Sequence, residues 1–333
     1  MGSPSGLVFI HLLADKGLQP LGAQFVLGTG SAAALGALLT SEPGKSLIEQ
    51  IQAAQCACLL SRDDAPSLPV DIAELTQQVG FECLNGETLC RVDGPGAPAF
   101  APAAKWVDGL WYLTPPAKPR NAQAASKVMA LKLVQLVSAD ADTCEIEDVF
   151  RQDPTLSYHL LRLVNSLAFG ASRRISSFSQ AILMLGRQQL KRWLNLILFA
   201  AGADDPRAPM LLGHVVVRAR MMELLTQETG SDKAQQELAF MAGMFSMLGV
   251  LFGQPLEEVF KPLQLDETLQ AAVLAHQGPI GQMLQVVESA QARDEGAVSE
   301  WLVRNGVSAD VFNRLMLTSV QWMLGMRQEG SDD

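Results

Sequence analysis

The chain has 333 residues, of which 48% are hydrophobic and 18% are charged, and its net charge is −10. This composition is typical of a well-packed globular protein and excludes a disordered chain. The negative charge argues against a general nucleic-acid binder, because such proteins neutralise phosphates with Lys and Arg. The length exceeds that of a usual single domain, so we expect two domains.

The sequence carries no sign of secretion or of a membrane span. Its first residues combine a short apolar run with no positively charged lead, and no uncharged apolar run of about 18 residues follows. Five cysteines, an odd number, fit reduced thiols better than a disulfide framework. We therefore expect a cytoplasmic protein that does not bind a membrane.

Residues 1–118 are predicted to form a small α/β domain. Apolar runs of strand length alternate with helical patterns, which favours a layer built on a largely parallel sheet. The expected strands are 7–13, 23–27, 56–60 and 81–84, and the expected helices are 31–39, 46–54 and 71–79. A last apolar run, 106–113, leads into the Pro-rich segment 115–119, which marks the domain boundary.

Residues 119–333 are predicted to form an all-α domain, because nearly every segment has helical period. The fold class expected for the whole chain is therefore α+β with two domains. The expected helices are 126–138, 145–152, 154–169, 179–201, 207–229, 233–252, 266–277, 279–293 and 308–327.

A glycine-rich turn follows the second expected strand. Residues 28–33 read G-T-G-S-A-A, which is the G-x-G-x-x-A pattern that lets a backbone approach a pyrophosphate at a helix N-terminus. No acidic residue closes the next strand at the usual distance, so the match is weak. The alternative is a plain strand-to-helix turn capped by Thr29 or Ser31.

The cysteines and histidines do not form a recognisable metal site. The spacing of Cys56, Cys58, Cys83 and Cys90 fits no common zinc motif, so buried free thiols are the better interpretation. The histidines, His11, His159, His214 and His276, are isolated in sequence, and each is expected to be a solitary polar residue, although sequence distance alone does not exclude that they converge in space. We predict no catalytic residue, no metal and no cofactor.

Polar side chains gather in the segment 153–192, which reads as two helices with a tight link. Such a cluster could bind an acidic peptide or a phosphate, or it could be a solvated helix face. We call its members the candidate interaction surface: Asn165, Ser166, Arg173, Arg174, Ser176, Arg187 and Arg192.

Residues 160–194, LLRLVNSLAFGASRRISSFSQAILMLGRQQLKRWL, closely resemble the most recognisable segment of the HDOD domain, a bacterial signalling module related to the HD phosphohydrolases. The resemblance continues through 241–263 and 275–281. It implies a helical bundle over about 120–293. In HD enzymes a segment such as L-A-G-L-L-H-D-I-G supplies the metal-binding His-Asp pair. Here residues 241–249 read M-A-G-M-F-S-M-L-G, with Ser246 and Met247 in those places, so the resemblance implies that the catalytic metal is lost.

The end of the first domain, WVDGLWYLTPPAKP, resembles the tail of an EAL domain, and the phrases above resemble the subfamily in which an EAL domain precedes HDOD. However, 118 residues are about half of a full β/α barrel, and no E-A-L element precedes a string of acidic ligands. The resemblance implies a degenerate, shortened EAL-like domain, and the alternative is an unrelated small α/β domain.

These observations predict a non-catalytic bacterial signalling protein whose HDOD domain acts through protein–protein interaction. Its partners are expected to be unidentified signalling proteins, with a nucleotide second messenger as a possible further ligand. One alternative is a receptor for a nucleotide or cyclic dinucleotide. The other is a divergent HD-type phosphohydrolase.

Overall fold

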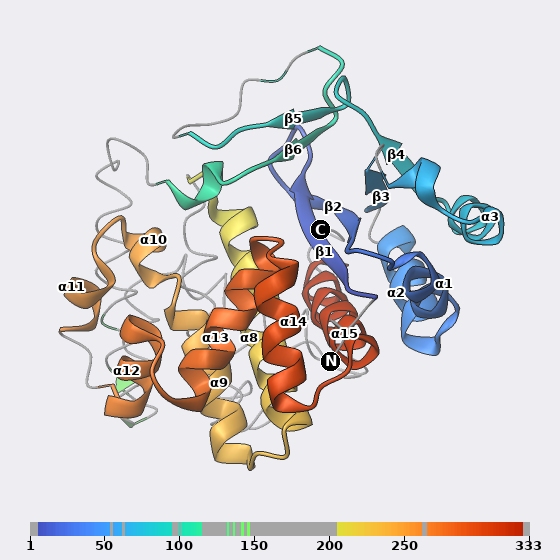
Figure 1. The fold of residues 1–333 in the computed structure, drawn as a ribbon. Coiled ribbons are helices and arrows are strands. Elements are labelled where there is room, and N and C mark those ends of the chain that lie inside the picture. The colour runs from blue at the N-terminus through green and yellow to red at the C-terminus, as the bar shows by residue number, and fades with distance from the viewer. Residues whose placement is uncertain are drawn as a thin grey trace, which may run out of the picture.

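The computed structural model describes residues 6–53, 56–61, 64–94, 100, 102–114, 205–261 and 265–328, with a few single positions between 132 and 146. Within these residues an α/β part comes first in the chain and a helical part follows (Figure 1). The predicted α+β, two-domain class is confirmed. The boundary expected at 118/119 and the helices expected between 126 and 201 lie outside the described residues, single positions apart.

The α/β part is built on a six-stranded sheet with the strand order β4-β3-β2-β1-β6-β5. Strand β1 is antiparallel to both of its neighbours, while the remaining neighbours are parallel. The expectation of a largely parallel sheet therefore fails at the centre, because a short turn joins β1 directly to β2 and such hairpins are antiparallel. The strands are β1 (Val8–Ala14), β2 (Pro20–Leu27), β3 (Ala57–Ser61), β4 (Glu82–Leu84), β5 (Leu89–Arg91) and β6 (Trp106–Asp108).

The sheet curls so that its two edges approach each other. The edge strands β4 and β5 are consecutive in the chain, and only residues 85–88 join them, a span of at most about 18 Å. Leu13, Leu59 and Leu84 form a small buried cluster inside the curl. At Gly22 a Cβ atom would lie 2.9 Å from the Leu59 side chain and 3.0 Å from Trp106. Glycine at this position thus allows the concave face to close.

Three helices flank the sheet at its β2–β4 side (Figure 1). They are α1 (Ala32–Thr40), α2 (Glu42–Ala53) and α3 (Val70–Gln78). Each agrees with its expected range to within a few residues. Short 3₁₀ helices cover Ala65–Ser67 and Trp111–Leu113.

The described helical part runs from α8 to α15. The expected run 233–252 is broken at Ser246 and Met247, and α11 and α14 were not expected. The helices are α8 (Ala208–Glu228), α9 (Lys233–Phe245), α10 (Leu248–Phe252), α11 (Leu256–Phe260), α12 (Glu267–Ala275), α13 (Gly278–Gln291), α14 (Glu295–Asn305) and α15 (Ala309–Gln328).

One hydrophobic core runs through both parts, from Leu7 in the first to Leu324 in the last helix. Helix α15 lies between them, and it contacts α8 on one side and α1, α2 and β1 on the other (Figure 1). The C-terminal helices therefore pack directly on the N-terminal layer. In the part of the chain that the structure describes, no helix is both long and apolar enough to cross a membrane.

Candidate functional site

A group of polar side chains lies where the sheet meets the helices, and we call it the junction cluster. Its members come from strands β1, β2 and β6, from the 3₁₀ helix Trp111–Leu113, from helices α8 and α13, from the residues that end α9 and α12, and from the turn after α13. They are His11, Gln24, Asp108, Tyr112, His214, Arg218, Ser246, His276, Glu288, Gln291 and Arg293.

Arg218 on α8 is the centre of the helical half of the cluster. Its Nη1 donates to Ser246 Oγ at 2.8 Å and to Glu288 Oε1 at 3.1 Å. Its Nε and Nη2 both donate to Gln291 Oε1, at 3.0 and 2.6 Å. Burial lowers the pKa of Arg218, and the neighbouring Glu288 opposes that change. The guanidinium group is thus held by acceptors at the end of α9 and on α13.

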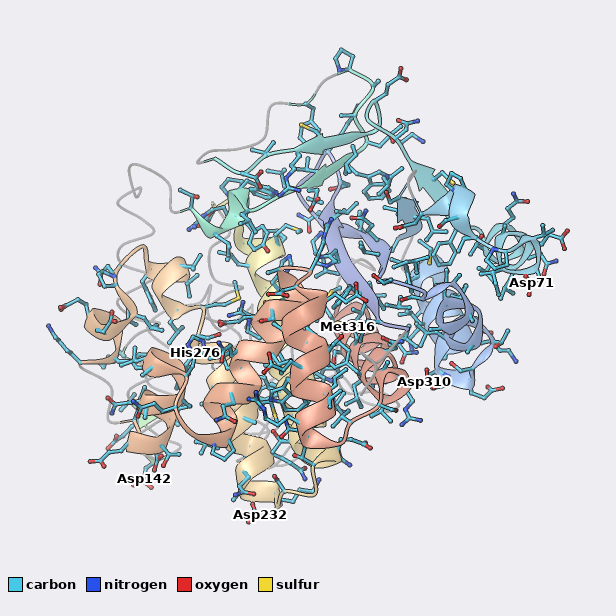
Figure 2. All side chains as sticks on the ribbon, viewed as in Figure 1. Asp71, Asp142, Asp232, His276, Asp310 and Met316 are labelled. Atoms are coloured by element: carbon cyan, nitrogen blue, oxygen red, sulfur yellow. The ribbon has the colours of Figure 1, made fainter. Side chains whose placement is uncertain are left out.

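Glu288 on α13 connects Arg218 to His276, which lies at the C-terminal end of α12. The second carboxylate oxygen of Glu288 lies 2.8 Å from His276 Nε2. His276 ends α12 in the left-handed conformation, with φ of 51°, and its side chain is 40% exposed. Figure 2 labels His276 near α12 and α13, where the junction cluster reaches the surface.

Two histidines from distant parts of the chain converge in the cluster. His11 lies on β1 and His214 on α8, and His11 is close enough to contribute to the pKa of His214. Burial lowers the pKa of both to about 3, with Arg293 adding to the effect at His11, and His11 and Arg218 adding to it at His214. His214 stacks on Tyr112, with ring centroids 4.4 Å apart and an interplanar angle of 11°.

The expectation that each histidine is solitary is therefore wrong for this pair. Folding brings β1 against α8, and that contact cannot be read from sequence distance. Both rings are neutral at pH 7, and within the described structure neither buried Nε2 atom has a hydrogen-bond partner.

Arg293 ties the helical half of the cluster to the sheet. It lies in the turn between α13 and α14, and its φ is +64°. Its Nη2 donates to Gln24 Oε1 on β2 at 3.3 Å and to Asp108 Oδ2 on β6 at 3.2 Å. A left-handed arginine is strained, so the surrounding contacts must over-determine this conformation.

The glycine-rich turn expected at residues 28–33 is a strand-to-helix turn between β2 and α1. Neither Thr29 nor Ser31 caps the helix by a side-chain hydrogen bond. Instead Glu295, at the start of α14, accepts from the Thr29 backbone N–H at 2.9 Å and from its hydroxyl at 3.1 Å. A Cβ atom at Gly28 would lie 2.8 Å from the same carboxylate, so glycine is needed for this approach.

The cysteine prediction is only partly right. Cys58 is buried, and burial together with the adjacent Cys56 raises the pKa of its thiol to about 12. Cys56, Cys58, Cys83 and Cys90 are all free, but Cys83 is exposed because it lies on the edge strand β4.

The candidate interaction surface falls outside the described residues, so its seven members stay a prediction. The sequence reasoning missed Arg218, Glu288, Arg293 and Glu295. In the sequence these four residues resemble ordinary surface charges. The one available signal was that Arg218 follows His214 by four residues, which places the two side chains next to each other on a helix.

Ser246 and Met247 lie at the break between α9 and α10. Met247 is 2% exposed and belongs to the hydrophobic core. Ser246 Oγ accepts from Arg218 and donates to the Gly243 carbonyl at 2.8 Å. Across the described ranges no group of three or more His, Cys, Asp or Glu side chains is placed to hold a metal ion. The Ser246 hydroxyl binds a cation of the protein itself, the guanidinium group of Arg218.

Comparison with known proteins agrees with the helical pattern. The model of the HDOD domain matches residues 124–277. The chain contains an HDOD domain. That match ends one residue before α13, so α13 to α15 follow the matched HDOD region, while Arg218, Ser246 and His276 lie within it.

Two curated relatives are similar over part of their length. The cyclic di-GMP phosphodiesterase CdgJ of Vibrio cholerae is 27% identical over 215 residues, which are 64% of this chain and 49% of the relative. The uncharacterized protein YuxH of Bacillus subtilis is 28% identical over 182 residues, 53% of this chain and 43% of the relative. The chain thus matches about half the length of these relatives or less.

Two solved structures are also similar. One is a putative phosphohydrolase from Shewanella amazonensis, with 17% identity, a TM-score of 0.42 and coverage of 60% of this chain and 93% of that one. The other is an HDOD domain protein of unknown function from Geobacter sulfurreducens, with 20% identity, a TM-score of 0.34 and coverage of 54% and 73%. At these TM-scores no structural detail is carried over from either.

The expectation that the protein is not an enzyme is contradicted, because a relative is named as a cyclic di-GMP phosphodiesterase. The expectation rested on the replacement of one His-Asp pair by Ser246 and Met247 and on the missing E-A-L element. These two observations concern the catalytic sites known from HD and EAL enzymes, and they do not test for a catalytic site made of other residues. The presence of an HDOD domain is confirmed.

Proposed function

We propose that this protein transmits signals in a pathway linked to cyclic di-GMP, and that its HDOD domain acts by binding a partner protein. The HDOD match and the name of the Vibrio relative support the pathway. The N-terminal layer, which we propose to be a degenerate EAL-like domain, is the proposed input side. The candidate interaction surface, Asn165 to Arg192, is the proposed output side.

The observation that carries this proposal is the environment of Ser246. A guanidinium group, which stays positive at any ordinary pH, donates to the Ser246 hydroxyl and is held by three further hydrogen bonds to Glu288 and Gln291. A divalent cation at the same place would meet that charge at close range. Ser246 therefore helps to connect α8 to the end of α9. Such a connection suits a domain that changes conformation and binds a partner protein.

The proposal is tested by partner capture with the full chain. Arg173→Glu and Arg187→Glu reverse charges on the candidate interaction surface, and Arg304→Glu reverses an exposed charge on α14 as the matched control. We expect both test variants to lose specific partners that the wild type and the control retain, with unfolding temperatures changed little, because exposed charges contribute about 1 kcal/mol or less. Equal capture by all four proteins contradicts the proposal.

A second candidate function is hydrolysis of cyclic di-GMP, which the name of the Vibrio relative favours. The test is incubation of the purified chain with cyclic di-GMP and Mg²⁺ or Mn²⁺, with the linear product followed by chromatography. Turnover that scales with protein concentration supports this function, and its absence with both metals contradicts it. Calorimetry with the same nucleotide separates binding from turnover.

A further inference from the structure

We propose that the segment 288–295, which comprises the last turn of α13, the turn after it and the first residue of α14, couples the N-terminal sheet to the HDOD helices, and that Arg293 is its latch, the residue that holds the segment to the sheet. This inference rests on the proposed signalling function, since it names the element that carries a change from the input layer to the output domain. The turn follows the residues that match the HDOD family, so the family model does not assign it a role.

On the helical side, the last turn of α13 holds the HDOD region through two side chains. Glu288 accepts from Arg218 and lies within hydrogen-bond distance of His276, while Gln291 accepts two hydrogen bonds from Arg218. Arg218 in turn donates to Ser246. The end of α13 thus links α8, the end of α9 and the end of α12.

On the sheet side, the next residues of the segment, Arg293 and Glu295, contact the N-terminal layer. Arg293 donates to Gln24 and Asp108, which lie on β2 and β6, on either side of β1. Glu295 accepts from both the backbone and the hydroxyl of Thr29. Eight residues therefore contact three segments of the N-terminal layer and two helices of the HDOD region, α8 and the end of α12, and they reach the end of α9 through Arg218.

The backbone of Arg293 gives the turn its character as a latch. A non-glycine residue at φ of +64° is strained, and two sets of hydrogen bonds offset that strain. The backbone N–H groups of Arg293 and Asp294 donate to the carbonyls of Ala290 and Ser289 at 3.1 and 2.9 Å, and the Arg293 side chain donates twice to the sheet. When the side chain leaves the sheet, only the backbone hydrogen bonds remain to offset the strain. Gln291 is only two residues away, so relaxation of the turn frays the end of α13 and weakens the contacts to Arg218.

Arg293→Ala tests this mechanism, because alanine keeps the strain of the left-handed conformation while the side-chain contacts to the sheet disappear. Hydrogen exchange of the full chain, without partner or nucleotide, is the measurement. We expect exchange to accelerate roughly tenfold both at β2 and β6 and in α8 around Arg218, which is the loss of one charge-assisted hydrogen bond. Glu300→Gln, in an exposed pair on α14, is the control and leaves both regions unchanged.

Asp108→Asn weakens the hydrogen bond between Arg293 and the sheet by changing the acceptor, and it leaves the sequence of the turn intact. It is expected to reproduce the pattern, including the faster exchange in α8. Acceleration confined to the sheet and the turn, or an equal acceleration of every amide in both variants, overturns the coupling role. Because neither variant touches the candidate interaction surface and no partner is present, failure here is distinct from failure of partner capture.

Discussion

The two buried imidazoles make the stability of the protein depend on pH. The pKa of His11 and of His214 is lowered from 6.5 to about 3, so each ring is neutral in the folded chain and takes up a proton on unfolding below pH 6.5. Stability is therefore complete above pH 6.5 and is lost as the pH falls toward 3. At pH 5 the loss is about 2 kcal/mol for each ring, or about 4 kcal/mol together. A domain stability of roughly 5–15 kcal/mol makes that loss easy to measure.

His214→Phe isolates one of the two contributions. Phenylalanine keeps a ring against Tyr112 and removes a nitrogen that has no partner within the described structure, so stability at pH 7 should change by no more than about 1–2 kcal/mol. Urea unfolding at pH 7 and pH 5 should show a loss of about 2 kcal/mol in this variant and about 4 kcal/mol in the wild type. Lys261→Gln, in an exposed ion pair, serves as the control. Identical pH dependence in the variant and the wild type would refute a buried, neutral His214.

Two further substitutions test how the parts are held together. Asn313→Ala removes the side chain that accepts from the Val8 N–H at 2.9 Å and donates to the Gly6 carbonyl at 2.7 Å, so two buried backbone groups lose their partner and urea unfolding should show a loss of about 2–4 kcal/mol. Gly243→Ala places a Cβ atom 2.7 Å from the Ala219 backbone, where α8 and α9 touch, and should cost about 1–3 kcal/mol by overpacking in the same assay. Unchanged midpoints in either variant would contradict the packing described for that contact.

The elements of the N-terminal layer could largely be predicted because local pattern and packing agree there. Apolar runs such as 7–13 are buried on both faces of the sheet, α1 is apolar almost all round, and α2 and α3 each have an apolar face. Strand β5 escaped prediction because three residues carry no period. The antiparallel position of β1 escaped because strand order depends on contacts between distant segments.

The glycine-rich turn shows where a motif stops being informative. Its glycines do allow an anion to approach the backbone, as the pattern indicates, but the anion in the structure is the carboxylate of Glu295, 266 residues from Thr29. Nothing in residues 28–33 distinguishes a phosphate from a carboxylate of the same chain. Only the position of α14, a helix that the periodicity did not reveal, decides between them.

The junction cluster could not be predicted because its charges are placed by packing between helices. Arg218, Glu288 and Arg293 each fall on a helix or turn in a pattern that also suits a solvated face. The one informative signal was the replacement of an expected His-Asp pair by Ser246 and Met247, and it pointed to lost metal binding at that position. In the structure that position is still polar, since Ser246 accepts from Arg218 and donates to the backbone. Arg218 is covalently part of α8, so its guanidinium group links α8 permanently to the end of α9 and to α13, whereas a metal ion at this position could dissociate. In the proposed signalling function, this permanent link is what passes a movement of one helix to the others.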